Sequence, residues 1–575
     1  MPTLEFKGKQ HIYAHHLTVP YSPLVVDPLK SHPPSAHATD SDLVPNDNLI
    51  IHGDNLYALK ALLPRYAGKV NCIYIDPPYN TGNEGWTYND NVNSPMMQEW
   101  LKDNGPVDNE DLERHDKWLC MMWPRLQLLR ELLADDGVIF VSIDENEEHH
   151  LRMLMDSVFG EANFLNSFAW VNNLKGRQLT GRGAARTHEP IFAYAKDTRF
   201  IDWPFQIDIG LATGVMPDAY RIKTYEEQYD DIGPYVIKNQ LYNTNSKFNE
   251  ETAPTLVFNI HYSPHEGAVR FTEVDSEETF DGFTLIRPRD CRDGVHSWHA
   301  WRWSQRKISE ELHDLHFEEH KNSYRIYTKI RDYRVTAMKD LITNLSNGND
   351  ELKQLGVSFP SPKPSALVQA LIGTVVSDRA IILDSFAGSG TTAHATLSLN
   401  AREGGNRRFI LVECEDYADS ITAQRVRYVI DGIPEAKDEA LKDGLGGSFT
   451  YCTLGDPFDA ESLLNGEGLP NYETLAVFLI HTAAGLSLDA DALRTARNDQ
   501  RFYQAETTDY YLYYEPDIEW LKSDEAMLTP ERAKQIEAVG RDAVVFGAGK
   551  YLSQRELTDM GITFCQLPYE LFRGG

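Results

Sequence analysis

Short apolar runs alternate with segments of helical periodicity in the first part of the chain. Residues 48–54 (NLIIHGD), 69–75 (KVNCIYI) and 137–143 (GVIFVSI) are mostly apolar, as buried strands are. Residues 55–63 and 114–136 instead place their large apolar side chains about every third or fourth position, which predicts helices. Strands that alternate with helices in this way predict an α/β fold with a parallel sheet covered on both faces.

Two further strands are predicted at residues 164–171 and 191–196. Before them, Asp144 followed three residues later by Glu147 predicts a capping box, opening a helix that ends at Gly160. Between about 200 and 355 the pattern breaks into short strands, turns and aromatic-rich segments. It then resumes with helices at 364–376, 391–400 and 417–430 and strands at 379–384 and 408–413. One α/β domain interrupted by an inserted module accounts for both parts.

These boundaries predict five segments. The first is rich in proline, so we expect residues 14–47 to be extended rather than helical or part of a strand. The segments are an N-terminal arm (1–47), the first part of the α/β domain (48–200), an inserted region (201–355), the second part of the α/β domain (356–446), and a small C-terminal domain (447–575) suited to partner or dimer contacts.

A glycine-rich turn, DSFAGSGTT, occupies residues 384–392 between a predicted strand and a predicted helix. Glycines there let the backbone approach a ligand closely and present N–H groups at a helix N-terminus. Glu413, which ends the next strand, can accept both hydroxyls of a ribose. A phosphate-binding P-loop is the rival interpretation, but it needs a lysine before the Ser or Thr, and none is present.

The second motif is Asp76-Pro77-Pro78-Tyr79, which follows a predicted buried strand. Two prolines donate no backbone hydrogen bond, so the carboxylate and the carbonyls are left as acceptors. This arrangement suits an exocyclic amine, whose N–H groups need oxygen partners. Tyr79 offers an aromatic face on which a base taken out of a duplex can stack.

The net charge of -31 over 575 residues is unfavourable for a nucleic-acid-binding protein unless positive charge is concentrated locally. Residues 171–200 and 321–340 each carry a net charge of +4, whereas residues 451–575 carry -11. Two basic stretches in an acidic chain favour a local DNA-binding groove. The six cysteines are scattered and no long apolar run occurs, so we expect a cytoplasmic protein with reduced thiols and no membrane contact.

The amino-acid sequence around both motifs resembles that of a known family. Residues 74–84 (YIDPPYNTGNE) and 384–395 (DSFAGSGTTAHA) resemble the amino-group DNA methyltransferases of the beta class. Residues 48–59, 136–147, 359–364 (FPSPKP) and 564–572 look like the modification subunits of type III restriction-modification systems. The resemblance implies a Rossmann-like AdoMet-dependent methyltransferase sheet in circularly permuted order, with an inserted target-recognition module and a small C-terminal domain.

The resemblance also implies roles for particular residues. Asp76, Pro77, Pro78 and Tyr79 hold the flipped adenine. Asp54 lies near the cofactor adenine, Glu413 or the nearby Glu415 binds the ribose, and the segment around Lys363 closes over the methionine end. The loop that binds S-adenosylmethionine consists of Asp384, Phe386, Ala387, Gly388, Gly390 and Thr391. Within it, Asp384 lies near the methionine amino group.

The implied activity is N6-adenine methylation of a specific site in duplex DNA. N4-cytosine methylation is the alternative within the class, although its enzymes more often carry Ser in place of Asp76. A catalytically silent DNA-reading subunit is the alternative from another class, and a dehydrogenase is disfavoured because the G-x-G-x-x-G spacing is missing. We expect a homodimer, and any restriction activity would come from a separate subunit.

Overall fold

The computed structural model describes residues 4–33, 47–81, 114–173, 184–201, 205–217, 220, 226–291, 294–343, 347–457, 469–488, 493 and 500–567. The chain divides into two compact units. The large unit comprises residues 1–207, 214–217 and 337–575, and the inserted unit comprises residues 208–213 and 218–336.

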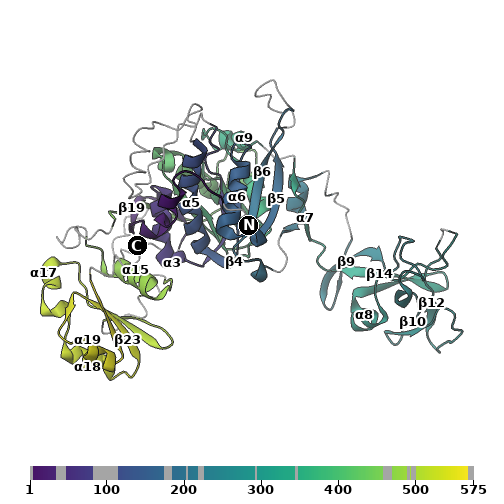
Figure 1. The fold of residues 1–575 in the computed structure, drawn as a ribbon. Helices are drawn as coiled ribbons and strands as arrows, with labels where there is room; N and C mark the ends of the chain where they lie inside the picture. The colour runs from purple at the N-terminus through teal and green to yellow at the C-terminus, as the bar shows by residue number, and fades with distance from the viewer. Residues whose placement is uncertain are drawn as a thin grey trace. The chain divides into compact units, whose positions relative to one another are not determined.

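A ten-stranded sheet forms the centre of the large unit (Figure 1). In spatial order its strands are β1 (Leu24–His32), β19 (Phe449–Leu454), β2 (Leu49–His52), β18 (Arg408–Glu413), β17 (Ile381–Asp384), β3 (Val70–Ile75), β4 (Leu133–Ser142), β6 (His188–Ala195), β5 (Phe164–Val171) and β16 (Leu341–Ile342). Neighbouring strands from β19 to β4 are parallel. β6 runs antiparallel to both β4 and β5, so the sheet is mixed rather than wholly parallel.

The strand order confirms the permuted Rossmann-like fold. Counting β17 as the first strand and following the chain through β18 and then from β2 onward, the seven strands from β2 to β5 read 3-2-1-4-5-7-6 across the sheet. The order reverses between β17 and β3, which are paired in parallel with Ile382 opposite Cys72. In open α/β sheets, ligands bind at the carboxyl ends of strands where the order reverses.

Helices cover both faces of this sheet. On one face lie α3 (Asn55–Tyr66), α5 (Arg114–Leu132) and α6 (Glu148–Phe159), and on the other lie α9 (Gly348–Gln354), α11 (Thr391–Glu403) and α12 (Gln424–Asp431). Along β18, Ile410 and Val412 pack into the first layer, whereas Phe409 and Leu411 pack into the second. Because alternate residues of a strand point to opposite faces, a strand buried on both sides must be apolar on both, as residues 409–412 are.

The N-terminal segment differs from the expected extended arm. It contains α1 (Lys9–Ile12) and α2 (His15–Thr18), and β1 pairs antiparallel with β19 at the edge of the sheet. Ile12 and Val19 are buried in the core of the first helical layer. Proline 28 lies in an edge strand, where a missing N–H is tolerated, so the proline content did not exclude strand structure.

The predicted capping box at Asp144 and Glu147 is wrong. Helix α6 begins at Glu148, and the side chain of its N-cap residue, Glu147, makes no capping hydrogen bond. The Glu147 carboxylate is fully buried and instead contacts the imidazole Nδ1 atoms of His115 (2.6 Å) and His150 (2.8 Å). Three-residue spacing alone could not reveal these competing partners.

The inserted unit contains two small antiparallel sheets. One has the order β13 (Leu315–His320), β14 (Ser323–Ile330), β9 (Gly233–Gln240) and β8 (Glu227–Asp230), and the other has β11 (Ala268–Thr272), β10 (Asn259–Ser263) and β12 (Thr284–Ile286). Phe258, Ile260, Trp301 and Ile326 lie in their shared core. The unit is shorter than the expected 201–355 region, because β16 and α9 belong to the large unit.

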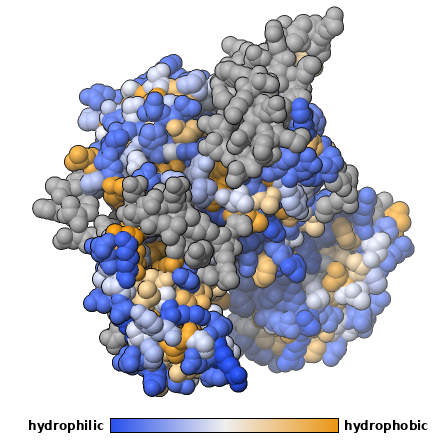
Figure 2. Space-filling model, turned by 60° about the vertical axis from the view of Figure 1, so that its left-hand side comes forward, coloured by the Kyte–Doolittle hydropathy of each residue, from blue (hydrophilic) through white to orange (hydrophobic). Residues whose placement is uncertain are grey.

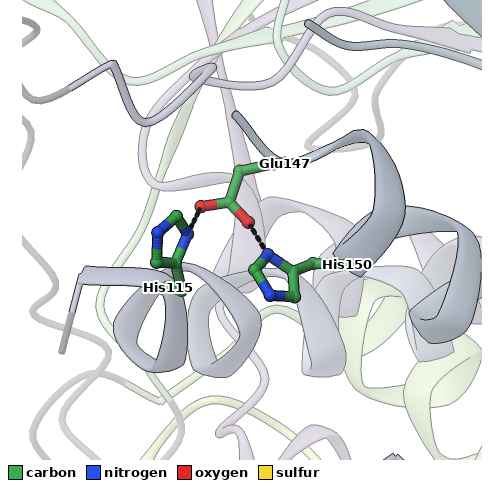
Figure 3. Close-up of side chains that lie close together, drawn as sticks. All are labelled: His115, Glu147 and His150. Atoms are coloured by element: carbon green, nitrogen blue, oxygen red, sulfur yellow. Dashed lines mark hydrogen bonds and ion pairs between the residues drawn. The ribbon is translucent and has the colours of Figure 1, made fainter. Parts of the chain in front are cut away.

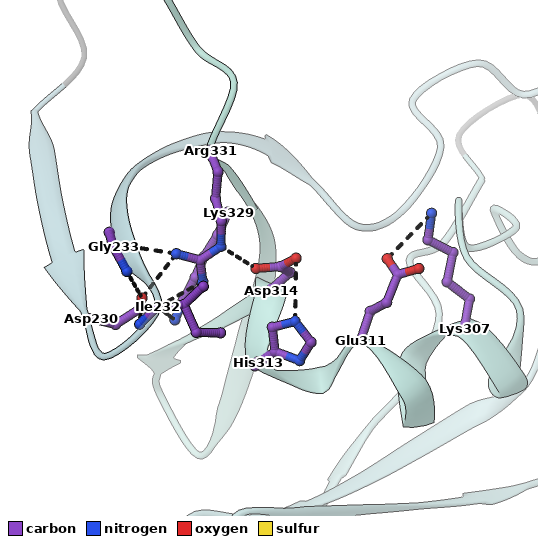
Figure 4. Close-up of polar contacts among 9 residues, drawn as sticks. All are labelled: Asp230, Ile232, Gly233, Lys307, Glu311, His313, Asp314, Lys329 and Arg331. Carbon is purple, nitrogen blue, oxygen red and sulfur yellow. Dashed lines mark hydrogen bonds and ion pairs between the residues drawn. The ribbon is translucent and has the colours of Figure 1, made fainter. Parts of the chain in front are cut away.

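Part of the basic stretch at 321–340 is neutralised inside the inserted unit (Figure 4). Lys329 Nζ and Arg331 Nη1 lie 2.6 and 2.9 Å from the Asp230 carboxylate, and Arg331 Nε lies 2.7 Å from Asp314. Hydrogen bonds from Arg331 and Lys329 hold the pKa of Asp230 well below its usual range. Arg334 pairs in the same way with Glu227, at 3.2 Å. These three cations stabilise the unit itself, so the net charge of the stretch overstates its capacity for phosphate.

The C-terminal part of the large unit has its own four-stranded sheet. Its order is β20 (Arg501–Gln504), β21 (Thr508–Leu512), β23 (Asp542–Gly547) and β25 (Ile562–Gln566). Helix α15 (Tyr472–Ala484) covers one face, while α18 (Pro530–Glu537) and α19 (Gln554–Asp559) cover the other. β19 belongs to the central sheet, so this part begins after residue 454 rather than at 447.

Hydrophilic side chains predominate on the face drawn in Figure 2, and hydrophobic ones occur there in small groups. Among the described residues, no helix has both the length and the apolar character required to cross a membrane.

Candidate active site

The two sequence motifs meet where the central sheet reverses its order. Asp384 ends β17, and Asp76 directly follows β3, the neighbouring parallel strand. Glu413 ends β18 on the other side of β17. All three carboxylates therefore project from the same edge of the sheet, although more than 300 residues of sequence separate Asp76 from the other two.

The glycine-rich turn wraps this edge in a conformation that requires glycine. Gly388 and Gly390 have φ angles of 51° and 80°, in the left-handed region that L side chains rarely adopt. A Cβ atom at Gly388 would lie 3.3 Å from the Phe359 ring, and one at Gly390 would lie 3.1 Å from the Thr422 carbonyl oxygen. Ala387 N–H donates to the Val412 carbonyl (3.0 Å), which ties the turn to β18.

Asp384 is buried beneath the turn. Its carboxylate accepts hydrogen bonds from the Phe386 backbone N–H (3.0 Å) and the Thr392 hydroxyl (2.5 Å). Burial raises the pKa of Asp384 to about 7, against the opposing effect of these two hydrogen bonds. The carboxyl group therefore changes charge near neutral pH, where a cationic ligand would favour the ionised form.

Glu413 reaches the same turn from the side. Its carboxylate accepts the backbone N–H of Gly388 at 2.7 Å and that of Glu415 at 3.0 Å. Burial raises the pKa of Glu413. The Glu415 side chain is exposed, whereas Glu413 is 5% exposed. Glu413 is thus the carboxylate that faces the turn, and its remaining lone pairs suit ribose hydroxyls.

Asp54 lies beside Glu413 at the start of α3. Gly53 N–H donates to the Glu413 backbone carbonyl (3.0 Å), and Asp54 caps the helix by accepting Leu56 N–H (2.8 Å). Arg125 Nη2 lies 3.3 Å from the Asp54 carboxylate. The Asp54 side chain is partly exposed, so it remains available to a ligand at this edge.

In the Asp76–Tyr79 segment, one backbone carbonyl, that of Pro78, already accepts a hydrogen bond from a side chain. The Trp118 indole N–H donates to the Pro78 carbonyl (2.7 Å), which fixes the segment against α5. Pro77 is buried, and the Tyr79 hydroxyl donates to Glu189 Oε2 on β6 (3.1 Å). Burial and nearby carboxylates raise the pKa of Tyr79 well above its usual value, so it stays a neutral phenol.

The side-chain nitrogen of Lys363 contacts the residues that are predicted to bind the target base. Its Nζ donates to both carboxylate oxygens of Asp76 (2.9 and 2.7 Å) and to the Tyr79 hydroxyl (2.6 Å), and it lies 3.7 Å from Glu189. The Lys363 carbonyl accepts the hydroxyl of Thr391 in the glycine turn (3.3 Å). The residue expected at the methionine end therefore contacts both motifs, with its charge on the target side.

Several residues of this site were not predicted from the sequence. Arg425, fully buried in α12, donates to Ser389 Oγ (2.9 Å) and Thr391 Oγ1 (2.8 Å) and so fixes the turn. Asn55 donates to the Ser385 carbonyl (2.9 Å). An arginine within a buried helical face was the available signal for Arg425; Asn55 and Glu189 carried none. Trp86 and Tyr88 follow the Asp76–Tyr79 motif closely enough in sequence to be candidates for capping the pocket or for core packing, and both lie outside the described residues.

The site fits the S-adenosylmethionine that the family resemblance implies. The positive φ angles of Gly388 and Gly390 and the tight contacts that a Cβ atom would make there both disfavour a side chain, which leaves backbone at these positions. The buried Ser385 Oγ has no hydrogen-bond partner among the described residues, so it can serve a polar ligand group. Buried carboxylates at Asp384 and Glu413 match an ammonium and a ribose, respectively.

Comparison with known proteins identifies a matching family model and several relatives. A family model described as DNA methylase matches residues 70–424. The type III restriction-modification enzyme EcoPI Mod subunit of Escherichia phage P1 is 31% identical, over 69% of this chain and 64% of that protein. The EcoP15I Mod subunit of Escherichia coli is 29% identical, over 64% of this chain and 59% of its own. The chain thus spans less than two thirds of these two relatives.

Shorter proteins match over more of their length. The type II methyltransferase M.KpnI of Klebsiella pneumoniae is 28% identical, over 70% of this chain and 92% of its own. Among solved structures, the PvuII DNA methyltransferase (cytosine-N4-specific) aligns with 68% of this chain and 92% of its own at 12% identity and a TM-score of 0.32. The fold assignment rests on the strand order of the central sheet.

Proposed function

The chain belongs to the DNA methylase family, and we propose that it transfers a methyl group from S-adenosylmethionine to N6 of adenine at a specific sequence in duplex DNA. One observation carries the proposal: Asp76 and Tyr79 already hold an amine nitrogen, that of Lys363, beside the glycine turn. An exocyclic amino group presents the same kind of donor to the same acceptors.

S-adenosylmethionine supplies an electrophilic methyl group when it is bound. The residues of this chain then have a positioning task, because an in-line displacement needs the amine nitrogen aligned with the methyl carbon. Asp76 and the Pro77 carbonyl accept the two N6 hydrogens, which orients the nitrogen lone pair and disperses its developing positive charge. As the new N–C bond forms and the C–S bond breaks, the nitrogen loses one proton to Asp76 or to water.

Lys363 must leave Asp76 before a target base can enter. Its ammonium neutralises the carboxylate of Asp76, whose side chain is 26% exposed, and the ammonium itself lies on a side chain that is only 9% exposed. The Tyr79 ring lies 4.9 Å from the same ammonium and is the surface on which the extruded base would stack. Binding of the base therefore exchanges one nitrogen donor for another on Asp76.

The similarity to the EcoPI and EcoP15I Mod subunits supports a role as the modification subunit of a type III restriction-modification system. In this proposal the inserted unit reads the DNA sequence, two copies of the chain form a dimer, and a separate subunit performs restriction. The protein would act in the cytoplasm, on the DNA of its host.

The test is incubation of the purified chain with S-adenosylmethionine and genomic DNA, followed by digestion and mass spectrometry of the nucleosides. We expect N6-methyladenine, and none with Asp76→Ala. N4-methylcytosine would support the alternative base specificity. Binding of S-adenosylmethionine with no modified base on any DNA would support the silent DNA-reading subunit.

A further inference from the structure

Two histidines and a buried carboxylate converge outside the methyltransferase site (Figure 3). His115 lies in the first turn of α5, Glu147 is the N-cap residue of α6, and His150 lies in the first turn of α6. Both imidazoles direct Nδ1 at Glu147, at 2.6 Å from Oε1 and 2.8 Å from Oε2. These three potential ligand atoms lie within 4.8 Å of one another.

We propose that His115, Glu147 and His150 bind one divalent transition-metal ion, with Zn²⁺ the best match. Two imidazole nitrogens and one carboxylate oxygen form a donor set that zinc accepts readily and that Mg²⁺ and Ca²⁺, which prefer oxygen, do not. The Glu-x-x-His spacing of Glu147 and His150 places both ligands on one side of a helix start, as in carboxylate-bridged metal sites of helical bundles.

Access and rigidity both suit an ion. The Glu147 side chain is fully buried, whereas those of His115 and His150 are 36% and 24% exposed, so the cluster opens to solvent on the histidine side. All three ligands come from helix ends, which hold them more firmly than a loop would. A water molecule, or the exposed His149, whose ring lies 3.9 Å from that of His150, can complete a fourth position.

Binding requires a rearrangement of the ligand atoms and a change in the tautomer or protonation of the two imidazoles. Ligand atoms around a tetrahedral zinc lie about 3.3 Å apart. The His115 and His150 Nδ1 atoms, now 2.6 and 2.8 Å from the carboxylate oxygens, must therefore move away by roughly 0.7 and 0.5 Å, and ligand atoms that are now up to 4.8 Å apart must approach each other by up to about 1.5 Å. The proton on Nδ1 of each neutral imidazole must move to Nε2 through solvent, which frees the nitrogen lone pair. An imidazolium would instead release its proton to solvent.

The ion would stabilise the turn that follows the target-binding segment. Asn80, fully buried next to Tyr79, donates from Nδ2 to the Glu147 carboxylate and to the Arg114 carbonyl (3.1 Å). Its φ of 58° is unusual for a residue other than glycine. A metal on Glu147 would therefore join the starts of α5 and α6 to this strained turn, as a structural rather than a reacting centre.

The test is zinc binding by the full-length, tag-free protein after treatment with a chelator. Calorimetric titration with Zn²⁺ should show one ion per chain, and Co²⁺ should give the intense visible absorption of a four-coordinate site. His115→Ala and His150→Ala should each weaken Zn²⁺ binding at least tenfold. His313→Ala, which removes a histidine 3.6 Å from Asp314, is the matched control and should not change it.

Two results would overturn the proposal. No Zn²⁺ uptake, or the same affinity in both histidine variants as in the wild type, would show that the cluster is only a hydrogen-bonded group. Glu147→Gln provides a second variant if an alanine variant does not fold, since it keeps the size of the side chain; unchanged Zn²⁺ affinity in it would count equally against the site. Far-UV circular dichroism checks the fold of each variant.

Discussion

Asp384 should make the affinity for S-adenosylmethionine depend on pH. Its buried carboxyl group has a pKa of about 7, and the proposed role is to face the methionine ammonium. A positive ligand group beside Asp384 favours the ionised form, so binding must remove the proton when the carboxyl is neutral. The observed dissociation constant should therefore fall as the pH rises through 7.

The magnitude follows from the fraction ionised. With a pKa of about 7, about 3% of the Asp384 carboxyl groups are charged at pH 5.5 and about half at pH 7.0, so the affinity should rise about sixteenfold over that interval. The same raised pKa has the opposite effect on stability. Folding favours the protonated acid, so the free energy of unfolding contributed by Asp384 falls between pH 4 and 7, by about 4 kcal/mol.

Calorimetric titration at several pH values between 5.5 and 7.0 measures this dependence. The interval stays below pH 7.7, the approximate pH at which a free α-amino group is half deprotonated. Asp384→Asn is the control, because an amide can still accept the Phe386 N–H and donate to Thr392. Its affinity should be low and constant. A wild-type affinity that is flat with pH, or a variant that follows the wild-type curve, would refute the reasoning.

Three other changes test the active site and the inserted unit that is proposed to recognise the DNA sequence. Asp76→Ala should abolish methylation while the S-adenosylmethionine dissociation constant changes less than about threefold; a collapse of affinity in a folded variant would contradict the assignment. Gly388→Val should weaken S-adenosylmethionine binding at least tenfold and cost about 1–2 kcal/mol of stability, because of its φ of 51° and the nearby Phe359 ring; unchanged affinity would remove the glycine-turn role. Exchange of residues 208–336 with those of a relative should change the methylated sequence, as read by sequencing of modified bases, and a chimera with the original target would place recognition elsewhere.

The strands of the central sheet could be predicted from the sequence because buried parallel strands are short apolar segments. A parallel strand buried on both faces is predominantly apolar, so the strands within residues 408–413 and 69–75 could be predicted, as could the motifs at their ends. The directions of β5 and β6 were not predicted. An antiparallel strand that is paired on both sides has the same apolar composition as a parallel one. Only the connections between strands distinguish the two directions.

Side-chain partners at the site depended on long-range contacts that no local pattern encodes. The family resemblance of the PKP segment predicted that Lys363 lies near the cofactor. The Lys363 ammonium instead donates to the Asp76 carboxylate, nearly 300 residues away in sequence. Glu147 has the spacing of a helix cap, but two histidines and Asn80 bind its carboxylate. In both cases partners of the charged group come from segments distant in sequence: Asp76 for Lys363, and His115 and Asn80 for Glu147.

The strand pair at the junction of the inserted unit has a consequence for how the protein folds. β7 (Gln206–Asp208) pairs with β15 (Val335–Ala337), so the two chain ends of the insertion are hydrogen-bonded to each other. Once that pair forms, about 130 residues no longer count as a flexible loop between β3 and β17. Loop-closure entropy grows with the logarithm of loop length, so early folding of the insertion lowers the barrier to pairing the two motif strands and reduces the effective contact order of the central sheet.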